Sequence, residues 1–141
     1  MKISKTSIVG IILIPAFIAG LTMMMMTGSK GTDPGDITPE VAKRYIDEGK
    51  IDLILDVRSP QEWNGPLGRI KDSKLIPVQV LSEKLDDIKD YKDKTILVYC
   101  HVGSRSSYSQ KLMEAAGFNK VLNLNGGIVE WKRKGYGTVK G

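Results

Sequence analysis

The chain has 141 residues, of which 41% are hydrophobic and 26% charged, a composition typical of a globular protein. The formal charge of +5 is spread over segments that mix both signs. This argues against a nucleic-acid-binding stripe and leaves a mild bias toward small anionic substrates. One cysteine and one histidine exclude an intramolecular disulfide and a cysteine/histidine zinc cluster. We therefore expect no metal, no cofactor and no nucleic-acid partner.

The first part of the chain has the properties of a membrane segment. Residues 6–29 carry no charge, and residues 8–26 would span about 28 Å as a helix, close to a hydrocarbon core of about 30 Å. Lys2 and Lys5 precede this run, which orients the N-terminus to the cytoplasm and the domain to the periplasmic or extracellular side. We expect residues 1–27 to be a retained anchor helix. A cleaved signal peptide, which would release an exported soluble protein, is the alternative.

The remaining chain alternates between helical and strand patterns. Residues 28–36, rich in glycine and aspartate, are expected to be a flexible linker, and residues 37–141 to form one domain. In chain order, we predict a helix at 38–49, a strand at 52–57, a short helix opened by a capping box of Ser59 and Glu62, a strand at 74–77, a helical stretch at 81–88, a strand at 95–99, a helix at 105–116, a strand at 120–124 and, after a Gly126-Gly127 turn, a helix at 128–134. The alternation predicts an α/β fold with a mainly parallel sheet flanked by helices on both faces, preceded by the apolar N-terminal helix.

The candidate site is the short segment between the strand at 95–99 and the helix that follows it. In open α/β sheets a ligand binds beyond the carboxyl ends of the strands, and Cys100 comes directly after this one. A tight loop at a helix N-terminus turns backbone N–H groups toward an anion, and Gly103 permits the backbone angles that such a loop requires. Arg105 would add a cation and a planar fork for oxyanions. The pattern therefore predicts a nucleophilic thiolate at Cys100, whereas the alternative is an inert buried cysteine.

Several motifs in order along residues 38–141 resemble the single-domain rhodanese (thiosulfate sulfurtransferase) family. They are Asp56-Val57-Arg58 with the following Glu62-Trp63, Gly68-Arg69-Ile70, Ile76-Pro77, the loop from Cys100 to Arg105, and the segment from Gly117-Phe118 to Gly135-Tyr136. The chain departs from the family at Arg69, where histidine is common, so the mouth of the pocket is expected to differ. The resemblance implies a rhodanese-like fold and a sulfurtransferase activity.

The resemblance also implies a mechanism and a set of site residues. Cys100 would attack the outer sulfur of thiosulfate or a persulfide donor and become a persulfide, which cyanide or a thiol then discharges. The backbone amides expected to hold the sulfur and the substrate anion belong to His101, Val102, Gly103, Ser104 and Arg105. We expect the His101 side chain to point away from Cys100, and Asp56 and Arg58 to support the site without taking part in the chemistry.

Two other functions could use the same loop. A phosphatase or arsenate reductase of the same fold would need a Cys-x5-Arg loop, whereas Arg105 lies five positions after Cys100. A redox-sensing or anion-binding module without turnover would need an external thiol to resolve an oxidised Cys100.

Overall fold

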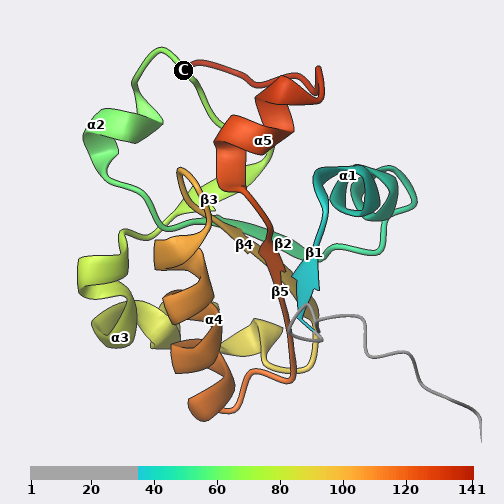
Figure 1. The fold of residues 1–141 in the computed structure, drawn as a ribbon. Coiled ribbons are helices and arrows are strands. Elements are labelled where there is room, and N and C mark those ends of the chain that lie inside the picture. Colours follow the sequence, from blue (N-terminus) through green and yellow to red (C-terminus); the bar gives the residue numbers. More distant parts are fainter. Residues whose placement is uncertain (1–34) are drawn as a thin grey trace, which may run out of the picture.

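The structure is a computed structural model that describes residues 35–141 (Figure 1). Five parallel strands form one sheet in the order β1-β5-β4-β2-β3, which confirms the predicted parallel α/β architecture. The strands are β1 (Asp36–Ile37), β2 (Leu53–Asp56), β3 (Ser73–Leu75), β4 (Thr95–Tyr99) and β5 (Lys120–Leu124). The predicted N-terminal apolar helix lies outside the described residues, and no helix within 35–141 is long and apolar enough to cross a membrane.

Helices cover both faces of the sheet. They are α1 (Pro39–Asp47), α2 (Pro60–Trp63), α3 (Leu81–Lys84), α4 (Ser104–Ala115) and α5 (Gly127–Arg133), with 3₁₀ turns η1 (Val78–Val80) and η2 (Leu85–Tyr91) on either side of α3. Figure 1 shows α3 and α4 on one side of the sheet and α1 and α5 on the other. Two buried apolar clusters fill these two interfaces.

The structure differs from the sequence prediction at three places. The strand β1 is not predicted by the sequence, which places Asp36 in the linker. Because a strand of two residues carries no periodicity, β1 is recognisable only through its pairing with β5. The expected helical stretch at 81–88 is divided, because α3 ends at Lys84, which has φ −105° and ψ 4°, and the 3₁₀ segment η2 that follows is itself kinked at Ile88. Gly127, expected in a turn, is the first residue of α5.

Alternation along β4 determines which way the residues after it point. Ile96 and Val98 belong to the cluster beneath α4, and Leu97 and Tyr99 belong to the cluster beneath α1 and α5. Because successive side chains of a strand point to opposite faces, Cys100 falls on the α4 side, and it is buried in that cluster.

The strand order brings two chain segments to one edge of the sheet. From β2 the chain moves outward to β3, and from β4 it moves the other way to β5, so the strand order reverses between β2 and β4. Asp56 at the end of β2 is in register with Tyr99 at the end of β4. Such a switch point is where open parallel sheets bind ligands, and here the segments after Asp56 and Tyr99 emerge side by side.

Candidate active site

The loop after β4 is fixed from two directions. Gly103 has φ 111°, the left-handed conformation predicted for it, and α4 starts at the next residue. On the other side, Ile128 and Val129 of α5 donate backbone hydrogen bonds to the carbonyls of Cys100 (2.9 Å) and His101 (3.2 Å).

Gly127 is what permits the close approach of α5 to this loop. Its φ is +60°, and a Cβ at this position would lie 2.4 Å from the His101 carbonyl oxygen. Any other residue at this position would push α5 away from the carbonyls that it holds, so Gly127 serves the site as well as the turn.

Cys100 is fully buried, and its Sγ accepts two hydrogen bonds. The backbone N–H of Gly103 donates over 3.1 Å and the Ser106 hydroxyl over 3.3 Å. The same hydroxyl lies 3.1 Å from the Gly103 carbonyl oxygen, but its single hydrogen serves one acceptor at a time. Because hydrogen bonds to ionised acceptors are the stronger ones, a thiolate draws this hydrogen to Sγ.

Ser106 was not among the predicted site residues. It is the third residue of α4, a position from which a hydroxyl reaches back over the start of the helix. The signal that identifies it is a small hydroxyl residue at this helix position, six residues after the cysteine.

The loop offers further donors to an anion. α4 begins without a side-chain cap, and its first N–H groups have no intrahelical partner. The loop and helix amides that donate to no atom of residues 35–141 belong to His101, Val102, Ser104, Arg105 and Ser106. Together with the dipole of a 12-residue helix, they provide a set of neutral donors around the position beyond Sγ.

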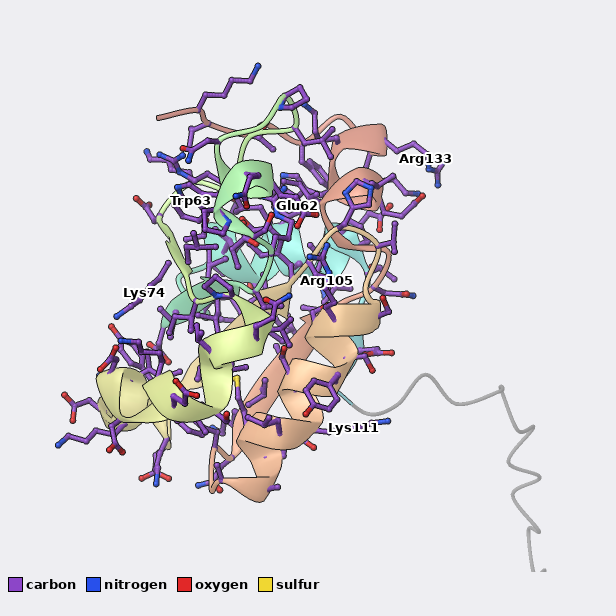
Figure 2. All side chains as sticks on the ribbon, turned by 90° about the vertical axis from the view of Figure 1, so that its left-hand side faces the viewer. Glu62, Trp63, Lys74, Arg105, Lys111 and Arg133 are labelled. Atoms are coloured by element: carbon purple, nitrogen blue, oxygen red, sulfur yellow. The ribbon has the colours of Figure 1, made fainter. Side chains whose placement is uncertain are left out.

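The Arg105 side chain is engaged by another residue of the protein. Its Nη1 and Nη2 donate to the two carboxylate oxygens of Glu62 over 2.8 and 2.7 Å (Figure 2). Glu62 is in turn held by the predicted capping box, in which its carboxylate accepts from the Ser59 amide and its own amide donates to the Ser59 hydroxyl. The Arg105 guanidinium, helped by Ser59 and opposed by partial burial, lowers the pKa of Glu62 from 4.5 to about 2.

This pairing changes what the Arg105 side chain can do. The sequence suggested that Arg105 is a free cation for the substrate, but in the structure Nη1 and Nη2 of Arg105 both donate to the Glu62 carboxylate. Glu62 was missed as a site residue, because the capping box already accounted for a glutamate at that position.

Asp56 and Arg58 form a second arginine–carboxylate pair, which is completely buried. Arg58 Nε and Nη2 donate to the Asp56 carboxylate over 3.0 and 2.7 Å, and Nη2 also donates to the Gly68 carbonyl over 2.8 Å. The pair thus connects the end of β2 with the loop after α2. Within residues 35–141, no hydrogen bond joins either side chain to Cys100.

Two hollows flank the active-site loop. The α4 hollow, about 540 Å³, is lined by Val78, Gln79, Ser82, Ser104, Arg105, Tyr108 and Leu112. The α2 hollow, about 310 Å³, is lined by Arg58, Gln61, Glu62, Gly65, Pro66, Leu67 and His101. The alternation that turns Cys100 toward α4 thus leaves His101 at the α2 hollow. Within the described chain, no hydrogen bond joins the His101 ring to the Cys100 Sγ. Residues 35–141 contain no group of three His, Cys, Asp or Glu side chains that could hold a metal ion.

Comparison with known proteins gives one family for this chain. A family model described as "Rhodanese-like domain" matches residues 38–134. A "Sulfurtransferase" of Allochromatium vinosum is 34% identical over 99 residues, covering 70% of this chain and 88% of that protein. A "Probable adenylyltransferase/sulfurtransferase" of Mycobacterium tuberculosis is 33% identical over 98 residues, and there the match spans only 24% of the relative's length. The crystal structure of a rhodanese-related protein from Thermoplasma volcanium superposes with a TM-score of 0.66 at 31% identity, covering 74% of this chain and 96% of that one.

Proposed function

The chain belongs to the rhodanese-like domain family, and we propose that it is a sulfurtransferase that carries a sulfane sulfur on Cys100. Sulfurtransferases are among its relatives. The observation that supports the proposal best is the environment of Sγ, a buried thiol with a backbone N–H and a hydroxyl directed at it and open amides beyond it. These groups stabilise negative charge both on Sγ and on a sulfur attached to it.

The proposed reaction has two half-steps. The Cys100 thiolate attacks the outer sulfur of a sulfane donor, the Sγ–S bond forms, and the donor's S–S bond breaks. With thiosulfate as donor, sulfite leaves with the bonding electron pair, and Cys100 becomes a persulfide. A nucleophile such as cyanide or a thiol then takes the outer sulfur, and Cys100 departs as the thiolate. The neutral donors at Gly103 and Ser106 stabilise the anion at the start and the end of the cycle.

A direct test is mass spectrometry of the purified protein before and after treatment with thiosulfate. We expect one added sulfur that dithiothreitol removes. Cys100→Ala should show no added sulfur and no transfer to cyanide, with an unchanged circular dichroism spectrum. Ser109→Ala, a matched change at a buried serine of α4 that donates to the Arg105 carbonyl and not to Sγ, should retain both.

An aryl-phosphate hydrolysis assay of the same proteins, run beside the thiosulfate experiment, separates the rival functions. Hydrolysis of an aryl phosphate that depends on Cys100, with thiosulfate inert, would replace the sulfurtransferase by a phosphatase-like enzyme. A reversibly oxidised thiol that neither accepts nor donates sulfur would indicate the redox module.

We also propose, from the sequence of residues 1–27, that the domain is held at a membrane on its periplasmic or extracellular side. The full chain should sediment with membranes and be cleaved by protease added to spheroplasts. A soluble chain that starts near Ser29 would indicate a cleaved signal peptide instead, and a protease-resistant cytoplasmic chain would contradict both placements.

A further inference from the structure

The charged groups that line the two hollows are balanced in pairs. Arg105 in the α4 hollow is bound on two donors by Glu62, and Arg58 in the α2 hollow is bound by Asp56. His101 also lines the α2 hollow. The active-site loop therefore meets its donor with neutral amides and a hydroxyl, and among residues 35–141 each arginine that lines these hollows has a carboxylate partner.

This balance bears on the charge of the sulfur donor. A dianion such as thiosulfate needs compensation for two negative charges, and the cation nearest the loop is already compensated by Glu62. A donor with one negative charge, or none, loses less from the same carboxylate, because the interaction with Glu62 scales with the donor charge.

We propose that Glu62 is a specificity-determining residue, which biases the site toward singly charged or neutral sulfane donors, such as organic persulfides and thiosulfonates, and against dianions. The inference rests on the proposed sulfur transfer and concerns only which donor is preferred. Glu62 acts through Arg105 as a positioning and charge-balancing residue and does not contact the reacting sulfur.

Glu62 is well placed for this role, because it remains both ionised and fixed. Its side chain is about one-third exposed, and it accepts from Arg105 and from the Ser59 amide at the same time. Its pKa of about 2 keeps it charged under all physiological conditions. The carboxylate therefore accompanies Arg105 in every encounter with a donor.

A matched pair of donors isolates the effect of charge. Thiosulfate carries two negative charges and methanethiosulfonate one, and both present a terminal sulfane sulfur. With methanethiosulfonate, the Cys100 thiolate takes the terminal sulfur, the donor's S–S bond breaks, and methanesulfinate leaves with the electron pair. One negative charge thus stays on the persulfide and one departs with methanesulfinate. The reaction with thiosulfate differs only in that the leaving sulfite carries two negative charges.

The variant to test is Glu62→Gln, since glutamine at this position of a capping box also satisfies the helix N-terminus while removing the charge. The effect of a charge that is about one-third exposed is on the order of 1 kcal/mol for a dianion, which is about fivefold. For a monoanion it is about half of that free energy, which is about twofold. We expect kcat/KM to rise about fivefold for thiosulfate and about twofold for methanethiosulfonate. Glu48→Gln, which removes the same charge from an exposed pair with Lys50, should change neither.

A second measurement uses the unmodified protein and therefore does not depend on the variant folding. Screening by salt sets in between about 0.05 and 0.5 M. Because Arg105 is compensated by Glu62, kcat/KM for thiosulfate should vary only weakly over this range, whereas with an uncompensated cation it would fall steeply as salt is added. Equal changes for both donors in Glu62→Gln, or a steep fall with salt in the unmodified protein, would overturn the inference. Absence of a Cys100 persulfide with both donors would instead refute the sulfurtransferase function itself.

Discussion

The two arginine–carboxylate pairs beside the active-site loop share their chemistry and differ in burial. Asp56–Arg58 is completely buried and also binds the Gly68 carbonyl, whereas the side chains of Glu62 and Arg105 are about one-third exposed. Removing one partner of a buried pair leaves an uncompensated charge in a medium of low dielectric, while an exposed charge is quickly solvated. The first pair should therefore determine whether the site exists, and the second should adjust which donor it uses.

The largest expected effect comes from breaking the buried pair. Arg58→Met should lower the free energy of unfolding by about 3 to 5 kcal/mol, because Asp56 is left as a buried carboxylate and the Gly68 carbonyl loses its donor. Urea unfolding followed by circular dichroism measures this as a lower midpoint.

The matched control is Arg133→Met, which breaks an equally short two-donor pair with Glu130 on the exposed face of α5. The free energy of unfolding of this variant should change far less than that of Arg58→Met, because water solvates the exposed Glu130 carboxylate once its partner is gone. Similar losses in the two variants would show that burial does not separate the roles of these pairs.

Much of this site could be predicted from the sequence, because it depends on local patterns. The strand before Cys100, the left-handed Gly103, the start of α4 and the Ser59–Glu62 capping box all follow from residues close together in the chain. What the sequence could not supply are contacts between distant segments. The Glu62–Arg105 pair joins residues 43 positions apart, and each had a sufficient local explanation of its own.

The strand β1 and the contact of α5 with the loop were unpredictable for the same reason. β1 is defined by pairing with β5, whose residue Asn123 donates its backbone N–H to the Gly35 carbonyl over 2.7 Å. The Gly126-Gly127 pair was recognised as a turn, but its need for glycine arises from the His101 carbonyl, which approaches only in the folded chain.

A smaller effect should follow from Ser106→Ala, which separates the stabilisation of Sγ from the charge balance around it. Loss of one buried hydrogen bond should lower the free energy of unfolding by about 1 kcal/mol, and the rate of persulfide formation should fall about fivefold to tenfold. Because no charge changes, the ratio of thiosulfate to methanethiosulfonate use should stay constant, in contrast to Glu62→Gln. Stopped-flow persulfide formation with both donors measures this, and an altered ratio would show that the hydroxyl, too, selects by charge.

The smallest expected effect, and the one with the most characteristic pH dependence, is that of Glu62→Gln on stability. The folded protein holds the pKa of Glu62 at about 2, below the 4.5 of a free glutamate, so the folded state binds the proton less readily than the unfolded chain. The pair's contribution is therefore fully present above about pH 4.5 and lost as the pH falls toward 2. Because the carboxylate is about one-third exposed, solvent screening reduces this contribution to less than about 1 kcal/mol at neutral pH. Urea unfolding of the unmodified protein and Glu62→Gln at pH 7, 4 and 2.5 should show a difference in free energy of unfolding that shrinks with each step down in pH. A difference that does not depend on pH would mean that the substitution acts through packing or the helix cap, and that the ion pair adds little to stability.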